Sequence, residues 1–338
     1  MRRQKRTAKS QVLITIAKVL FAGGLLVWLV GSGRLDFASL FSAPLSIFHL
    51  LGILALLANM FLQSVRWWWL LKTQSISLSL GQAVRLSWIG QFFSLVLPGA
   101  AGGELVRAYY IARDASADKV AGVSTVLLDR VLGLYALLWL GILPLLGLMI
   151  LPGQLTSTVI HMGVLILLLL VGASVLFLTL WVRPTRNLVL SLVPGRFRAP
   201  LVATVDAYQA HTRDLLACLA LSLVANIVLI GAFLLAGRIL DTPLSWEQVF
   251  LVVPLVIAAN SLPISLGGIG VAETTASVLF AQFGIETGAA IMLIVRLWVV
   301  ILRLPGGLVY MLRTHGPSVA QPVGEAKSTP RIGDEFRR

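Results

Sequence analysis

Long apolar runs, each about the length needed to cross a bilayer, constrain this chain more than any other feature. The hydrocarbon core is about 30 Å thick and a helix rises about 1.5 Å per residue, so a spanning helix needs about 20 mainly apolar residues. Because unpaired backbone groups are not tolerated in lipid, such runs are helical. The sequence therefore predicts an all-α polytopic membrane protein with six full spans. They lie at about 12–31, 45–65, 120–151, 157–182, 215–237 and 288–312.

The distribution of charge supports a membrane location and predicts an orientation. Only 12% of the residues are charged, and the net charge of +13 comes from basic residues between the apolar runs and at both ends. This pattern suits an anionic lipid surface and argues against nucleic acid as a partner. Because positively charged loops stay cytoplasmic, we expect a cytoplasmic basic arm over 1–10, one transmembrane domain over 11–312 and a disordered cytoplasmic tail over 313–338.

The segment 184–213 is too polar to span a membrane. Leu201, Val205 and Tyr208 recur at helical spacing on the side opposite Asp206. This spacing predicts an amphipathic helix in the membrane interface, with an ordinary cytoplasmic loop as the alternative. The segment separates two halves of the transmembrane domain, at about 45–182 and 215–312.

One motif occurs twice, and each copy closes a short apolar stretch. The stretches cover about 82–97 and 246–262, and both end in L-P-x-x-x-G-G, at 97–103 and 262–268. Proline and glycine end a helix and leave backbone groups that persist in lipid only where protein, water or a ligand satisfies them. The helix-breaking residues are Pro98, Gly102, Gly103, Pro263, Gly267, Gly268 and Gly270.

Two matching interrupted stretches predict an inverted-topology repeat. In such a repeat, one pair of broken or re-entrant helices enters from each face, and the pairs meet near the midplane around a substrate site. The restarted helices, beginning near Gly103 and Gly270, would point positive dipole ends at that region. Ordinary proline kinks in membrane helices are the alternative.

Charged residues occur at membrane depth, where each costs at least about 2.5–3.5 kcal/mol and usually faces a cavity and a partner. Glu104 and Arg107 are three residues apart and can pair, whereas Glu273 needs Arg296 or Arg303. Because arginines outnumber acids, we expect an arginine to bind a phosphate; ion pairs that only hold helices together are the alternative. The predicted substrate-binding residues are Glu104, Arg107, Asp129, Arg130, Glu273, Arg296 and Arg303.

Other sequence features favour a transporter over an enzyme. Arg66 precedes three tryptophans at the end of a span, which we interpret as an aromatic belt with a snorkelling cation. The four histidines lack metal-ligand spacing and Cys218 is the only cysteine, so we expect no metal and no cofactor. The sequence contains no ATP-binding phosphate loop and no nucleophile elbow.

Three ordered motifs resemble one membrane family. They are F-F-S-L-V-L-P-G-A-A-G-G-E-L-V-R-A-Y-Y at 92–110, L-D-R-V-L-G-L at 128–134 and N-S-L-P-I-S-L-G-G-I-G-V-A-E at 260–273. They are similar to motifs of the lysylphosphatidylglycerol synthase transmembrane-region family, also called flippase-like, and the resemblance covers about 10–312. It implies movement of a lipid across the membrane. This sequence stops after the membrane region, so the resemblance does not imply aminoacyl transfer.

We therefore expect a translocase of the bacterial inner membrane that moves an anionic phospholipid or a lipid-linked precursor. Its partners would be these lipids and an envelope-biosynthesis synthase. One alternative is a membrane-embedded headgroup transferase in which Glu104 or Glu273 acts as general base. The other is a non-transporting accessory subunit of envelope or polysaccharide assembly.

Overall fold

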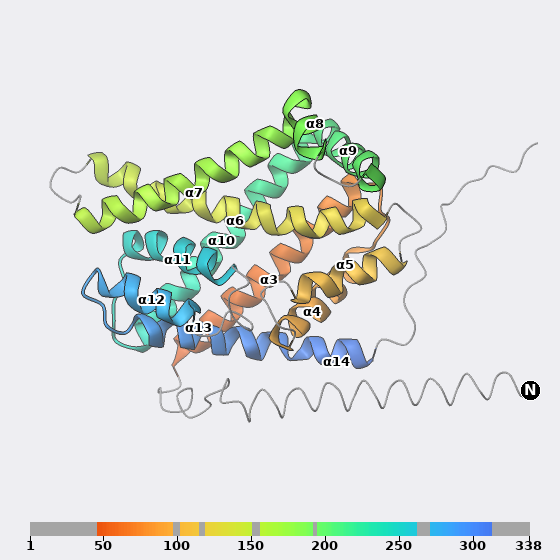
Figure 1. The fold of residues 1–338 in the computed structure, drawn as a ribbon. Coiled ribbons are helices and arrows are strands. Elements are labelled where there is room, and N and C mark those ends of the chain that lie inside the picture. The colour runs from red at the N-terminus through yellow and green to blue at the C-terminus, as the bar shows by residue number, and fades with distance from the viewer. Residues whose placement is uncertain are drawn as a thin grey trace, which may run out of the picture.

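The computed structural model describes residues 46–96, 102–114, 119–150, 156–191, 195–261 and 271–312. The regular elements in these ranges are all α-helices (Figure 1). Five helical segments are long and apolar enough to cross a membrane, so the chain is a polytopic membrane protein. These segments are α3 (Ile47–Thr73), α6 (Lys119–Ile150), α7 (Ser157–Trp181), α10 (Thr212–Ile239) and α13 (Gly288–Arg303) with α14 (Pro305–Met311).

Five of the predicted spans correspond to these segments. The largest difference is at α3, which continues past Val65 to Thr73. Trp67, Leu70 and Leu71 are fully buried. Packing inside the protein therefore stabilises the helix beyond the predicted end of the span. The predicted span at 12–31, the basic arm and the C-terminal tail lie outside the described residues.

Each predicted interrupted stretch corresponds to a helix followed by a second, short helix. These helices are α4 (Leu80–Val96) with α5 (Gly102–Asp114), and α11 (Trp246–Ser261) with α12 (Val271–Ala281). α4 packs against α5 and α11 against α12, and the two pairs lie at opposite ends of the bundle (Figure 1). Pro98, Pro263, Gly267, Gly268 and Gly270 lie between the paired helices, outside the described residues.

Gly102 and Gly103 are the first residues of α5, and Gly103 lets this helix approach α4 closely. A Cβ atom at Gly103 would collide with the carbonyl oxygen of Gly90 and with Oγ of Ser94, both on α4. The second glycine of the first L-P-x-x-x-G-G motif therefore has a packing role as well as a helix-breaking one.

The polar segment between the halves forms two helices, α8 (Arg183–Ser191) and α9 (Gly195–Ala210), whereas the sequence predicts one helix or a loop. The predicted amphipathic pattern appears in α9: Tyr208 is buried and Asp206 is exposed. Burial raises the pKa of the Tyr208 phenol. Nη1 of Arg186 on α8 binds Oδ1 of Asp206 at 2.7 Å, which joins the two helices.

Local backbone geometry recurs at residues that are 166 positions apart. After α3, the N–H of Ile76 donates to the carbonyl of Leu71 at 3.1 Å. After α10, the N–H of Thr242 donates to the carbonyl of Gly237 at 2.9 Å. The residue before each donor, Ser75 or Asp241, has a positive φ of 57° or 49°. The two helices therefore end in the same kind of turn.

The helices that follow these turns also begin alike, with a reciprocal cap of the form S-x-x-Q. The N–H of Ser79 donates to Oε1 of Gln82 at 2.9 Å, and the N–H of Ser245 donates to Oε1 of Gln248 at 2.8 Å. The return bonds, from the glutamine N–H to the serine Oγ, are present in both copies. The start of α4 is thus repeated at the start of α11.

α3 and α10 pack along each other and run in opposite directions. Nδ2 of Asn59 donates to the carbonyl of Ala225 at 2.7 Å. Ten residues later on α3, Nε1 of Trp69 donates to Oδ1 of Asp214, which lies earlier on α10. Asn59 and Ala225 are themselves 166 positions apart, so the two halves meet at equivalent positions. The other contacts follow the same pattern, because α6 packs against α11 as α13 packs against α4.

Candidate functional site

Two adjoining cavities, of about 260 and 270 Å³, lie at the ends of α4 and α11. Gln91 and Ser94 of α4 and Asn260 of α11 line both cavities, as do Gln63 of α3 and Arg303 of α13. The two interrupted helices therefore end at one shared chamber, which we define as these two cavities together.

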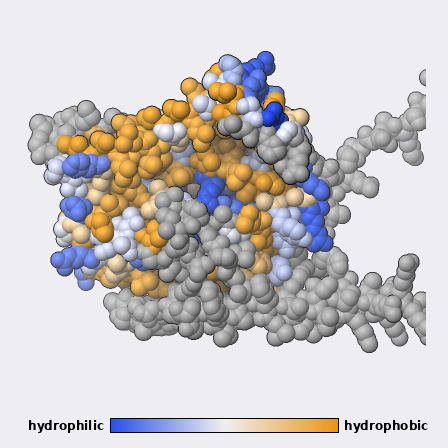
Figure 2. Space-filling model, viewed as in Figure 1, coloured by the Kyte–Doolittle hydropathy of each residue, from blue (hydrophilic) through white to orange (hydrophobic). Residues whose placement is uncertain are grey.

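The first cavity is lined mainly by polar and charged side chains, whereas the second is lined mainly by apolar ones beside Arg296 and Arg303. The surface around the chamber is apolar. Large apolar side chains are exposed along α7, among them Leu168 at 63% and Val175 at 56% exposed. Figure 2 shows this apolar surface and, near its centre, hydrophilic residues in a hollow. A polar hollow within a lipid-facing surface is a candidate binding site.

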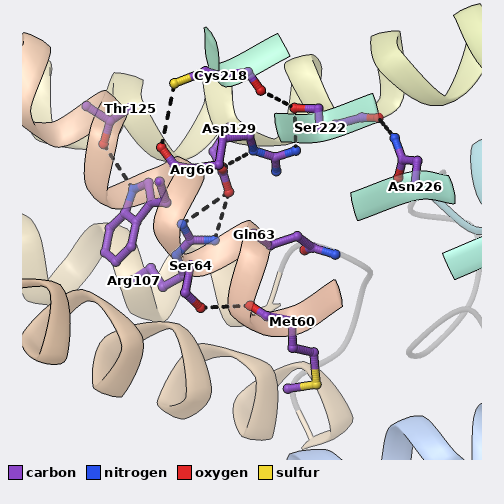
Figure 3. Close-up of polar contacts among 12 residues, drawn as sticks. Met60, Gln63, Ser64, Arg66, Arg107, Thr125, Asp129, Cys218, Ser222 and Asn226 are labelled. Carbon is purple, nitrogen blue, oxygen red and sulfur yellow. Dashed lines mark hydrogen bonds and ion pairs between the residues drawn. The ribbon is translucent and has the colours of Figure 1, made fainter. Parts of the chain in front are cut away.

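The most buried charges form a network around Asp129 of α6 (Figure 3). Nε of Arg66 donates to Oδ1 of Asp129 at 2.7 Å, and both terminal nitrogens of Arg107 donate to Oδ2 at 3.2 Å. Nη1 of Arg66 also donates to Oγ of Ser222 at 2.9 Å, and the Arg107 guanidinium lies 3.9 Å from the ring centroid of Trp67. Both carboxylate oxygens of Asp129 are therefore bonded to arginine.

A second ion pair lies within the first half, and its arginine also bonds to the second half. Nη1 of Arg130 binds Oε2 of Glu104 at 2.7 Å, and Nη2 of Arg130 donates to the carbonyl of Ser261 at 2.8 Å. Ser261 is the last residue of α11, so its carbonyl has no partner further along that helix. One arginine of the first half thus caps the interrupted helix of the second.

Among the described residues, the second half supplies an ion pair and an arginine with no carboxylate partner. Glu273 of α12 pairs with Arg296 of α13, one of the two arginines predicted as its partner. Arg303 lies seven residues further along α13 and lines both cavities. Within the described ranges it makes no ion pair, and its Nε has no hydrogen-bond partner. In the chamber and its immediate partners, five arginines (Arg66, Arg107, Arg130, Arg296 and Arg303) therefore meet three carboxylates.

Six of the seven predicted site residues line the chamber, and the seventh, Glu273, reaches it only through its pair with Arg296. Two interpretations change. The expected Glu104–Arg107 pair does not form, because α6 offers each residue a partner of opposite charge. Arg66 is not a snorkelling residue: it is only 4% exposed and bonded to Asp129. Its inward position could have been inferred from the sequence, because Arg66 follows Asn59 and Gln63 at helical spacing and the three residues form one polar stripe on α3.

No group of three or more His, Cys, Asp or Glu side chains in the described parts of the chain is placed to hold a metal ion. Cys218 is fully buried against α3 and is a free thiol.

The fold and chamber define a polytopic membrane protein with a charged cavity where two interrupted helices end. A family model described as the lysylphosphatidylglycerol synthase TM region matches residues 15–307. The chain belongs to that family. No curated protein and no solved structure matches the chain at a significant level.

Proposed function

We propose that this protein is a lipid translocase of the bacterial inner membrane that moves an anionic phospholipid or lipid-linked precursor between leaflets. The observation that carries the proposal is Arg303, a positive charge that faces both cavities with no ion-pair partner among the described residues. A guanidinium group binds phosphate through several charge-assisted hydrogen bonds. The substrate phosphate would balance this charge inside the chamber.

The repeated geometry supports an inverted-topology repeat, with α4–α5 and α11–α12 as re-entrant pairs. Antiparallel α3 and α10, equivalent turns 166 residues apart and re-entrant pairs at opposite ends of the bundle are what such a repeat requires. In this architecture a central site opens to one side and then the other. Arg130, which holds the end of α11 through Ser261, would release it as the acids change partners.

The charged ends of the bundle support an orientation with both termini in the cytoplasm. Lys72, Arg113 and Arg183 lie at the ends of helices that meet at one end of the bundle, whereas Arg238 lies at the other end together with Asp241 and Glu286. Basic residues accumulate on the cytoplasmic side of membrane proteins. The α4–α5 pair would then enter from the cytoplasm.

Both carboxylates considered for a transferase are in ion pairs, Glu104 with Arg130 and Glu273 with Arg296. A general base must reach the proton that it removes and must be free to accept it. The ion pairs therefore argue against Glu104 and Glu273 as the general base of a transferase.

A liposome assay tests the proposal. Purified protein is reconstituted with a fluorescent phosphatidylglycerol, and a membrane-impermeant quencher reports how fast the label reaches the outer leaflet. Arg303→Gln should slow translocation by at least about tenfold, because losing a charge-assisted hydrogen bond costs about 1.5–3 kcal/mol. Arg238→Gln is the matched control, since Arg238 is exposed and lines neither cavity.

Three results would contradict the proposal. They are equal rates for Arg303→Gln and the wild type, no translocation by the wild-type protein alone, and a headgroup-modified lipid among the products. The second result would favour an accessory subunit, and the third a transferase.

A further inference from the structure

As far as the described residues show, the chamber contains hydrogen-bonding groups without partners in addition to Arg303, which makes no ion pair. Oγ of Ser87 and Oδ1 of Asn260 are buried and, in the described part of the chain, have no hydrogen-bond partner. A buried polar atom left without a partner costs about 1–3 kcal/mol. Such atoms therefore mark a place where water or a ligand completes the hydrogen bonding.

These groups come from three different helices and converge on the same space. Ser87 of α4, Asn260 of α11 and Arg303 of α13 all line the 260 Å³ cavity. Asn260 and Arg303 also line the neighbouring one. One bound molecule in the chamber can therefore contact the charged group and the two neutral groups.

The chemistry of the three groups differs in a way that specifies the ligand. Arg303 only donates hydrogen bonds, which suits a phosphate oxygen. A serine hydroxyl and an asparagine amide each donate and accept, and they pair best with a group that also does both. Hydroxyl groups have this property, whereas acyl chains and esters do not donate.

The same lining disfavours a ligand that carries an ammonium group. Glu104 and Asp129 are the acids among the described residues lining the first cavity, and both are bonded to arginine. The described residues lining that cavity include no aromatic ring that could receive a quaternary ammonium. In the first cavity, where Ser87, Asn260 and Arg303 converge, an ammonium group would therefore meet excess positive charge without a compensating partner.

From this lining we propose that the chamber selects a phosphodiester lipid whose headgroup carries hydroxyl groups and no positive charge, such as a glycerol or sugar headgroup. The phosphate binds Arg303, and the headgroup hydroxyls bind Asn260 and Ser87. This inference rests on the proposed lipid-binding function and adds the class of headgroup to it.

Three lipids with the same acyl chains separate the contributions of charge and hydroxyl groups. Phosphatidylglycerol has hydroxyls, phosphatidylethanol has the same phosphodiester charge without them, and phosphatidylethanolamine adds an ammonium group. Binding to the purified full-length protein is measured by competition in mixed micelles and by native mass spectrometry. We expect phosphatidylglycerol to bind about tenfold more tightly than phosphatidylethanol, and phosphatidylethanolamine to bind most weakly.

Two kinds of variant assign the preference to the proposed groups. Asn260→Leu should reduce the preference for phosphatidylglycerol over phosphatidylethanol to about twofold or less, and Ser87→Ala should reduce it partly. Arg303→Gln should weaken both lipids by about tenfold and leave their ratio unchanged. Ser87→Ala removes one oxygen and serves as the second variant if Asn260→Leu does not fold, which thermal unfolding in detergent reveals.

The outcomes separate this inference from the proposed function. If phosphatidylglycerol and phosphatidylethanol bind equally, or if the ratio survives both Asn260→Leu and Ser87→Ala, the headgroup inference is wrong while anionic lipid binding stands. If none of the three lipids binds, the proposed function itself fails. Tightest binding of phosphatidylethanolamine would also overturn the inference.

Discussion

Replacing Asp129 by asparagine removes the negative charge from a buried network and leaves the surrounding shape nearly unchanged. In the wild-type protein, the side chains of Arg66 and Asp129 are each 5% exposed, and that of Arg107 is 13% exposed. After Asp129→Asn, two guanidinium groups face a neutral amide. We expect this substitution to lower the stability of the protein more than any single change at an exposed acid.

The expected cost follows from what remains unpaired. Removing one partner of a buried ion pair costs about 3–5 kcal/mol, because the other charge stays in a poorly solvated environment. Arg66 keeps its bond to Ser222, and Arg107 keeps its contact with Trp67 and borders the cavity. Two arginines lose their partner, but each keeps another contact. We therefore expect the free energy of unfolding to fall by about 3–5 kcal/mol in total and not by twice that value.

The free energy of unfolding can be measured by titrating the purified protein in detergent micelles with SDS and following tryptophan fluorescence. Asp241→Asn is the matched control, since Asp241 is exposed and has a positive φ that asparagine also tolerates. The control should change stability by less than about 0.5 kcal/mol.

A double-mutant cycle tests the reasoning directly. Asp129→Asn combined with Arg66→Met should be more stable than the sum of the single effects predicts, by about 1–3 kcal/mol, because one of the two unpaired charges is gone. The reasoning is wrong if Asp129→Asn lowers stability as little as Asp241→Asn does. It is also wrong if the effects of Asp129→Asn and Arg66→Met are additive, because Asp129 and its arginine partners would then not form a coupled buried network.

Two further predictions test packing and topology. Gly103→Ala should destabilise the protein by about 1–3 kcal/mol, because its Cβ collides with α4. The control Gly81→Ala, on the open side of α4, should be neutral or stabilising by up to about 1 kcal/mol. Similar unfolding curves for both variants would rule out the close α4–α5 contact. In a Cys218→Ala background, cysteines at the exposed positions Ser75 and Asp241 should react with an impermeant maleimide from opposite sides of oriented vesicles; labelling from the same side would exclude the inverted repeat.

The number and approximate limits of the described spans could be predicted because each depends only on the length of an apolar run. The L-P-x-x-x-G-G motif also located the ends of α4 and α11 at the chamber. The 166-residue repeat had a further signal in the sequence, the S-x-x-Q pattern at Ser79–Gln82 and Ser245–Gln248, whose reciprocal caps the structure shows. Both signals are local, so they can be read without knowing the packing.

The partners of the charged residues could be predicted only in part. Glu273 lacked a local cation, which left few candidates, and Arg296 is its partner. Glu104 and Arg107 are neighbours on one helix, yet each binds a residue of α6 more than 20 positions away. Arg66 lies 63 positions from Asp129, and no local pattern indicates that pairing. Ion pairs of this kind depend on which helix faces are in contact, and helix packing determines that.

α7 has no equivalent among the described residues of the second half. It is also the least buried of the five long segments, since only 17% of the residues in its most apolar 18-residue stretch are buried. In the proposed topology, α3 and α6 each traverse the bilayer once and the α4–α5 hairpin returns to its entry side. An even count of passages would give the second half the same orientation as the first. In that topology, the extra passage that α7 provides would turn the second half over. A chain lacking α7 would therefore present two half-sites to the same compartment, and no path between compartments would form.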